Sequence, residues 1–113
     1  MLALQGHRIT YFGHSTFSLT TPSGQVAIID PWVGDTTIAE LYKPELAMLP
    51  IGDRFTMGPR EAAYAIRLLG VKHVIPMHYG TFPFLTGTVD GLRRETPEIA
   101  GLGIPALKPG ESL

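Results

Sequence analysis

The sequence lacks cysteine, an excess of either charge and any long apolar run, and each absence excludes a class of protein. Without cysteine the chain forms neither disulfides nor thiolate zinc sites, and it has no cysteine nucleophile. Nine basic and ten acidic residues give a formal net charge of −1. The chain therefore has no excess of positive charge of the kind that binds nucleic acid or an anionic membrane. No apolar run approaches the ~18 residues of a membrane span, and the first residues do not resemble a secretory leader. The sequence predicts a soluble, cytoplasmic protein without nucleic-acid or membrane partners.

The residues that are present suffice for one small domain. The chain has 113 residues, of which 44% are hydrophobic, so a core is possible but thin. Thirteen glycines and ten prolines indicate frequent turns. We expect a single domain over residues 1–113, with a meander in 1–33 and a second half in 34–113.

The first third of the chain predicts three antiparallel strands. Residues 7–12 and 16–21 are rich in β-branched and aromatic residues, and a short glycine-containing turn separates them. A Pro–Ser–Gly turn then leads into a third strand over 25–30. The apolar run at 26–29 suggests that this strand is buried on both faces.

The remainder predicts alternating helices and strands. Thr37 and Glu40 have the spacing of a capping box at the start of a short helix, and an apolar strand follows at 46–51. A second helix is expected from Pro59 to the stop at Gly70. It leads into a strand at 74–77 and so makes a βαβ unit with parallel strands.

The tail predicts a helical turn over 88–95 and a short strand near 106–108. A meander followed by a crossover unit indicates a layered α/β or α+β domain.

Two histidines are candidates for chemistry. His14 lies in the turn between the first two strands, where it serves either as a ligand or proton carrier or as an ordinary turn residue. His78 follows the strand at 74–77, and sites in parallel α/β units gather at the carboxyl ends of strands. Its alternative role is a partly buried histidine that bonds a backbone carbonyl.

Three aspartates extend this set. Asp30 ends the third strand, and Asp35 precedes a helix, where it either favours the helix N-terminus or offers oxygen to a metal. Asp53 is either a turn residue or a group that orients a site histidine. Catalytic zinc normally needs three protein ligands, so His14, Asp35 and His78 suffice only if the fold brings them together.

Other conspicuous side chains have ordinary explanations. No basic stripe accompanies the aromatic residues, so they do not suggest a platform for stacking nucleic-acid bases. We expect surface positions for His7 and His73, a solvated face for Arg93 and Arg94, and hydrophobic cover for Trp32, Phe82 and Phe84.

Several longer motifs occur in order along nearly the whole chain, at 9–17, 28–32, 34–36, 41–53, 55–59, 74–83 and 107–111. Together they resemble the metallo-β-lactamase-fold proteins, in the uncharacterised metal-dependent hydrolase branch related to the ascorbate-6-phosphate lactonases. The resemblance implies part of an αββα sandwich. In intact relatives it also implies a pair of metals whose bound hydroxide attacks an ester, lactone or phosphodiester.

The resemblance also implies which ligands remain. Asp35 matches the metal-bridging aspartate and His78 the last metal histidine, whereas His14 and Asp30, with Asp53, are expected only to line the site. The family's HxHxDH motif, which supplies most ligands of the first metal, does not occur in this sequence. Zinc or manganese is therefore expected to bind weakly or not at all, and no residue is assigned as catalytic.

Two functions remain open from the sequence. The first is a metal-dependent hydrolase-like protein, impaired as an isolated chain, with a small-molecule substrate if active. The alternative is a non-catalytic oligomeric remnant or binding module, or a bare structural fragment. A shortened fold would expose strand edges or an apolar face, so we expect a homo-oligomer.

Overall fold

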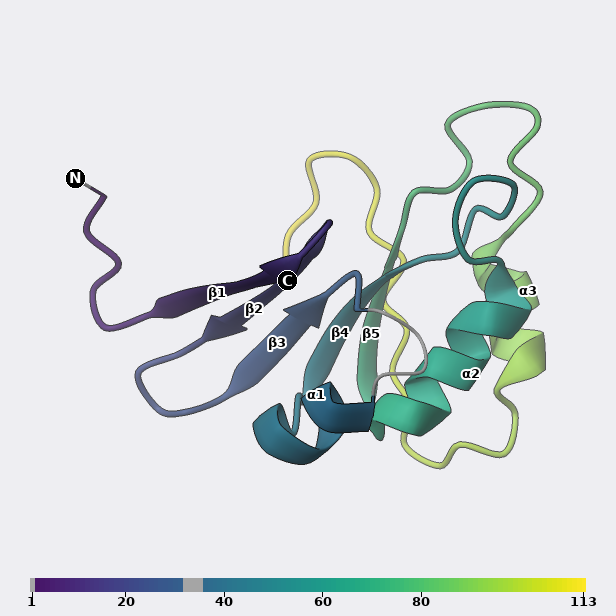
Figure 1. Cartoon of the computed structure of the whole chain (residues 1–113). Helices are drawn as coiled ribbons and strands as arrows, with labels where there is room; N and C mark the ends of the chain where they lie inside the picture. The colour runs from purple at the N-terminus through teal and green to yellow at the C-terminus, as the bar shows by residue number, and fades with distance from the viewer. Residues whose placement is uncertain (1, 32–35) are drawn as a thin grey trace.

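In the part of the chain that the structure describes, five strands form one sheet, with three helices beside it (Figure 1). The structure, a computed structural model, describes residues 2–31 and 36–113, so Trp32 and Asp35 lie outside the described part. The elements follow one another as β1 (Arg8–Gly13), β2 (Thr16–Thr20), β3 (Val26–Ile29), α1 (Thr36–Tyr42), β4 (Leu46–Pro50), α2 (Pro59–Leu69), β5 (His73–Met77) and α3 (Val89–Glu95).

The strands are arranged in the sheet in the order of the sequence. β1 pairs with β2 and β2 with β3 in antiparallel fashion, whereas β3–β4 and β4–β5 are parallel. The predicted meander and parallel βαβ unit are both confirmed. Because β1, β3, β4 and β5 run in one direction, their carboxyl ends meet at a single edge of the sheet, which we call the carboxyl edge.

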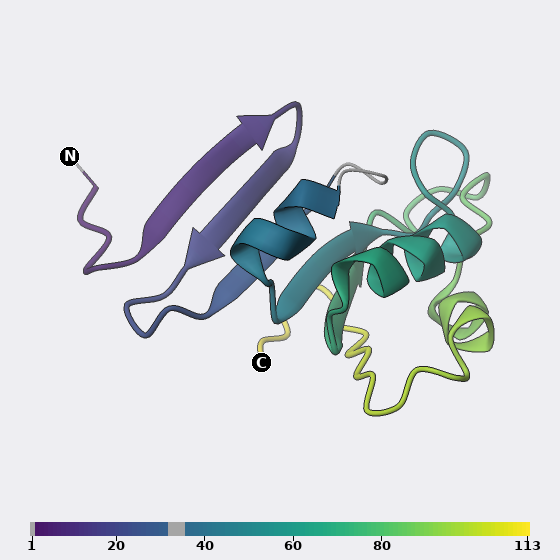
Figure 2. The same ribbon diagram turned by 60° about the horizontal axis from the view of Figure 1, so that its bottom comes forward.

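The core lies between the sheet and the helices. α1 and α2 lie on one face of the sheet, and α3 lies beside α2 (Figures 1 and 2). Alternation along the strands turns one row of small and branched side chains toward α2. The fully buried members of this core include Ile28, Ala47, Leu49 and Val74 on the strands and Ala62, Ala63 and Ile66 on α2.

The opposite face of the sheet carries no helix among the described elements. As a result, Ile28 is the only residue of β3 that is fully buried, and its neighbours are half-buried. The prediction that 26–29 is buried on both faces is therefore wrong. The apolar run reflects a strand covered by helices on one side only.

The expected ends of α2 are confirmed. The Glu61 carboxylate accepts a bond of 3.1 Å from the Gly58 amide, and Pro59 occupies the first turn, where no N–H is needed. Gly70 stops the helix with φ 68°, and its amide donates to the Ile66 carbonyl at 2.9 Å.

α1 begins at Thr36, so Thr37 lies inside the helix and not at its cap. The helix ends at Tyr42, and this ring packs edge-on against Phe12 with ring centres 5.0 Å apart. That contact ties α1 to β1 across the helix-covered face.

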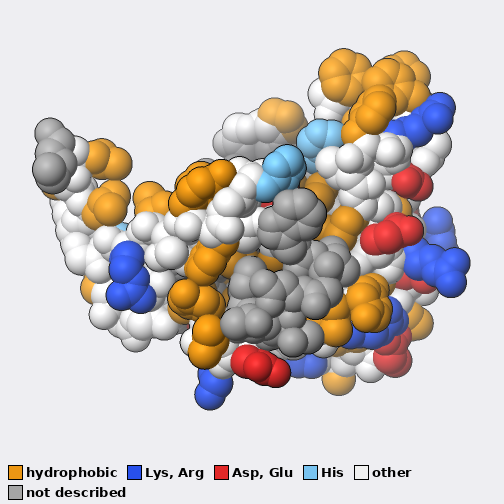
Figure 3. All heavy atoms as spheres, in the orientation of Figure 1, with side chains coloured by type: hydrophobic (Ala, Val, Ile, Leu, Met, Phe, Trp, Pro, Cys, Tyr) orange, Lys and Arg blue, Asp and Glu red, His pale blue; other side chains and the backbone are white. Residues whose placement is uncertain are grey.

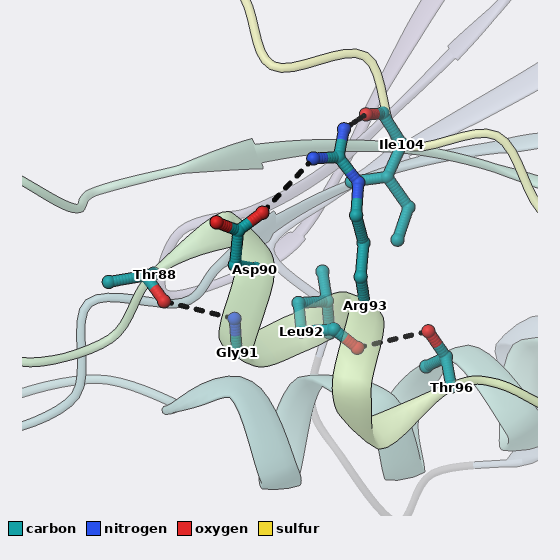
Figure 4. A network of polar contacts seen from close by, with 7 residues as sticks. All are labelled: Thr88, Asp90, Gly91, Leu92, Arg93, Thr96 and Ile104. Atoms are coloured by element: carbon teal, nitrogen blue, oxygen red, sulfur yellow. Dashed lines mark hydrogen bonds and ion pairs between the residues drawn. The ribbon is translucent and has the colours of Figure 1, made fainter.

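The C-terminal segment is fastened to α3 and forms no strand (Figure 4). The Arg93 guanidinium donates to the Ile104 carbonyl at 3.1 Å, so this residue is more than part of a solvated face. The strand expected at 106–108 is wrong: the described tail makes a single bridge, between Gly103 and His73. Pro105 and Pro109 flank this segment, and neither has a backbone N–H that could donate to a neighbouring strand.

Two glycines hold the loops of the carboxyl edge close to one another. The Gly87 amide donates to the Gly52 carbonyl at 3.1 Å. The amide of the preceding residue, Ile51, donates to the Met77 carbonyl at 3.1 Å. A Cβ on Gly52 would lie 2.0 Å from the His78 carbonyl oxygen, and one on Gly87 only 1.7 Å from that of Ile51. Only glycine permits these backbones to approach so closely.

His7 and His73 are exposed at the start of strands, as expected. Within the described part of the chain, no helix is long and apolar enough to cross a membrane.

The Thr88 side chain caps α3, because its Oγ1 accepts from the Gly91 amide at 2.9 Å (Figure 4). We predict that Thr88→Ala lowers the free energy of unfolding by about 1 kcal/mol. Chemical denaturation followed by circular dichroism measures this. Thr86→Ala, at an exposed position of the same loop, is the control; an equal loss in both variants would contradict a capping role.

Gly52→Ala is expected to cost about 2–3 kcal/mol, because the new methyl group collides with the His78 carbonyl. Gly103→Ala is the matched control, since its Cβ would meet its nearest atoms at ordinary distances of 3.7 and 3.8 Å. Denaturation midpoints that shift equally for the two variants would show that the close approach is not a constraint.

Candidate functional site

The carboxyl edge gathers the candidate residues that the structure describes. His14 follows β1, Asp30 follows β3, Asp53 lies just beyond β4, and His78 follows β5. Ligand sites in open α/β sheets lie at this edge. The fold thus places on one edge four residues that are far apart in the sequence, whereas Asp35 lies outside the described residues.

The backbone at these four positions is unusual. His14, Asp30, Asp53 and His78 have φ of 51°, 47°, 67° and 58°, the left-handed region that residues with a side chain seldom adopt. β1, β3 and β5 are therefore each followed directly by a sharp change of direction, and Asp53 makes another in the loop after β4. Strain of this kind concentrates at functional sites, which supports the carboxyl edge as the place to look for function.

His14 and Asp30 line the same cleft. The Ser15 hydroxyl donates a short hydrogen bond to the Asp30 carboxylate, and the Thr16 hydroxyl donates to the Asp30 carbonyl at 2.7 Å. The cleft has a volume of about 300 Å³, and Phe55 and Met57 complete its wall. The Ser15 contact orients the Asp30 carboxylate, and the Thr16 contact holds the Asp30 backbone beside the cleft.

Asp53 has a local structural role. Its Oδ1 accepts from the Arg54 amide at 2.8 Å, and its own amide donates to the Met57 carbonyl at 3.0 Å. These bonds are those of a turn residue, one of the two expected roles. Asp53 also borders a different hollow, which it shares with Arg60 and Glu61.

His78 lies in a third hollow. Its neighbours there include Tyr79, and Leu107 and Lys108 from the C-terminal segment. His14 and Asp30 do not line this hollow, so the two histidines border separate depressions of the same edge.

The described residues do not fit a metal centre. Among residues 2–31 and 36–113, no three histidine, aspartate or glutamate side chains are close enough to hold one ion. Catalytic zinc requires three protein ligands and an open position. The edge offers fixed carboxylate and imidazole groups, which can bind or orient a polar ligand, but it does not assemble them around a point.

Several residues of this edge were not singled out by sequence reasoning. Ser15 holds Asp30, and Phe55 and Met57 reach the His14 cleft from the loop after β4. The residues 55–57 belong to a motif shared with the resembled family. That they line the same cleft as His14 depends on which strands are neighbours, which the motif does not show.

The aromatic residues of the long loops do not cover the core. Phe82 and Phe84 stack with ring centres 5.4 Å apart, and Phe55 meets Phe84 edge-on at 5.8 Å. These three rings are 56%, 43% and 77% exposed, so the expected role of hydrophobic cover is wrong for Phe82 and Phe84. Figure 3 shows hydrophobic side chains gathered at the tip of the molecule formed by these loops.

No family model matches the chain. It is 61% identical over 77 residues to a UPF0173 metal-dependent hydrolase of Rubrobacter xylanophilus, a match that covers 67% of this chain and 32% of the relative. It is 48% identical over 114 residues to one from Korarchaeum cryptofilum, covering 88% of this chain and 50% of the relative. The chain thus spans about a third to a half of the length of these relatives.

Solved structures give the same picture for the fold. A metallo-hydrolase from Ignicoccus hospitalis matches 95% of this chain and 51% of its own, with a TM-score of 0.76 and 26% sequence identity. A metallo-β-lactamase-fold protein of Bacillus subtilis matches 97% of this chain and 50% of its own, with a TM-score of 0.68 and 17% identity. Over the segments it contains, the chain is therefore similar in sequence to the UPF0173 metal-dependent hydrolases, and its fold is that of metallo-β-lactamase-fold proteins.

Proposed function

We propose that this chain is a metal-dependent hydrolase-type protein whose hydrolase activity is impaired when it acts alone. One observation carries the proposal: the candidate residues stand on one edge of the sheet but border separate hollows, and no described group of three can hold a metal. The relatives are named metal-dependent hydrolases, so a metal is the expected cofactor of the complete site. Zinc and manganese are the ions we propose for it.

The chemistry of a complete site would be hydrolysis of an ester, lactone or phosphodiester in a small molecule. A metal bound in such a complete site would supply Lewis-acid stabilisation of negative charge and activation of water. In this chain the Asp30 carboxylate, held by Ser15, and the His14 imidazole border a cleft that can orient a polar substrate group. Efficient turnover would require further ligands, from another chain or from a rearrangement that brings His14 to His78.

A non-catalytic binding module is the second candidate function. The uncovered face of the sheet favours it, because Tyr11 and Phe17 are 59% and 37% exposed there. Such a module would keep its fold and its partners after loss of His14 or His78. The cytoplasmic location expected from the sequence stays a prediction.

An activity assay tests the first proposal. Purified protein with added zinc or manganese is incubated with ester, lactone and phosphodiester substrates, beside the full-length Rubrobacter xylanophilus relative. We expect hydrolysis by this chain no faster than by its His78→Ala variant and unaffected by chelators, because no three ligands among residues 2–31 and 36–113 surround one point.

His73→Ala, which removes an exposed histidine away from the carboxyl edge, is the matched control. Turnover that depends on added metal, falls at least about tenfold in His78→Ala and persists in His73→Ala would overturn the proposal of impairment.

A further inference from the structure

The cleft that His14 and Asp30 share presents a carboxylate to a ligand. Within the described part of the chain, its walls include no lysine or arginine that would neutralise this charge. Arg54, which follows Asp53 in the loop after β4, is turned toward another loop, where its Nε donates to the Phe84 carbonyl at 3.4 Å. Opposite charges attract across such a site and like charges repel, so the cleft favours a cationic group in a ligand over an anionic one.

The Asp30 carboxylate is held in place and keeps capacity for a ligand. The Ser15 hydroxyl is the only group among the described residues that donates to it, whereas a carboxylate accepts up to about four hydrogen bonds. The Asp30 backbone, with φ of 47°, is fixed by the Thr16 hydroxyl at 2.7 Å. A group positioned before the ligand arrives binds it at a lower cost in conformational entropy.

A second polar group in the cleft lacks a hydrogen-bond partner. Thr56 lines the cleft, and its hydroxyl is buried and unpaired among the residues that the structure describes. Nearly all buried hydroxyls in proteins are paired, so an unpaired one calls for an explanation. A primary ammonium group brings three N–H donors and can donate both to the Asp30 carboxylate and to this hydroxyl.

Aromatic and thioether side chains form much of the remaining wall. Phe55 and Met57 reach the cleft from the loop after β4. The Phe55 ring is 77% exposed, and it meets Phe84 edge-on with ring centres 5.8 Å apart. Most of this ring is therefore open to a ligand. Aromatic faces attract organic cations, and proteins use them to recognise ammonium groups.

We propose that this cleft binds a small organic molecule with a primary ammonium group and an adjoining apolar part. The ammonium group donates to the Asp30 carboxylate and the Thr56 hydroxyl, and the apolar part packs on Phe55 and Met57. The volume of about 300 Å³ suits a small molecule. The inference rests on the proposed function, because it specifies the substrate group that this cleft orients. It favours an ester or lactone that carries an amine over a phosphodiester, whose charge would repel Asp30.

Three probes of similar shape test the proposal: 2-phenylethylamine, 2-phenylethanol and 3-phenylpropanoate, which are cationic, neutral and anionic at neutral pH. Isothermal titration calorimetry with the intact chain, in the presence of a chelator, measures their dissociation constants. We expect the amine to bind at least about tenfold more tightly than the other two. Equal affinities for the three probes, or no detectable binding of the amine, would overturn the proposal. Because no metal and no hydrolysable bond are involved, this inference and the proposed function fail separately.

Two variants and their controls locate the binding. Asp30→Asn should raise the dissociation constant of the amine at least about tenfold and remove its preference over the alcohol. Asp90→Asn, at an exposed carboxylate of α3, is the matched control and should bind like the wild type. Phe55→Leu should raise the constant about threefold, and Phe82→Leu, at an exposed ring that does not line the cleft, should not. Equal losses in variants and controls would place the binding elsewhere.

Thr56→Val distinguishes a ligand contact from a structural role. Removal of an unpaired buried hydroxyl should leave the free energy of unfolding unchanged or higher, because valine has the same shape and needs no partner. The dissociation constant of the amine should nevertheless rise about fivefold. Unchanged binding together with a lower stability would show that this hydroxyl serves the fold and not the ligand.

Amide chemical shifts of the wild type decide the matter even if Asp30→Asn fails to fold. During titration with 2-phenylethylamine, we expect the largest changes at residues 14–16, 30 and 55–57, around the cleft. Residues 79–81, which line the separate hollow beside His78, should change little. The reverse pattern, or changes spread evenly over the chain, would contradict binding in this cleft.

Discussion

The packing of α2 against one face of the parallel strands is the interaction on which the rest of the structure depends. Small residues on the helix, Ala62 and Ala63, let it approach the row formed by Ala47, Leu49 and Val74, all fully buried. This contact sets which face of the sheet is buried and so decides which face stays open. It also fixes the crossover from β4 to β5 and thereby brings their carboxyl ends side by side.

The carboxyl edge shows what this framework provides and what it does not. It holds His14, Asp30 and His78 in a strained backbone geometry, with close glycine contacts behind them. A shared edge does not by itself bring side chains to one point, because the spacing between strands keeps the strand ends apart. In the described residues the edge brings His14 and Asp30 to one cleft and leaves His78 in another.

Local signals predicted the elements, whereas relations between distant segments were harder to predict. The Gly58–Pro59 start and the Gly70 stop of α2 were correct because caps depend on neighbouring residues. The sequence also placed His78 correctly at the end of a strand. The burial of β3 was wrong because an apolar run does not reveal whether one or two layers cover a strand. The contact of Phe55 and Met57 with the His14 cleft depends on tertiary neighbours, which spacing does not encode.

Metal content per chain, measured by elemental analysis after purification without chelator, tests the incomplete site most directly. Far less than one zinc or manganese per chain is predicted, equally in the wild type, His78→Ala and the His73→Ala control, because the described residues offer no three ligands to one ion. About one tightly bound ion per chain, lost in His78→Ala and kept in His73→Ala, would contradict this and show that His78 still belongs to a working metal site.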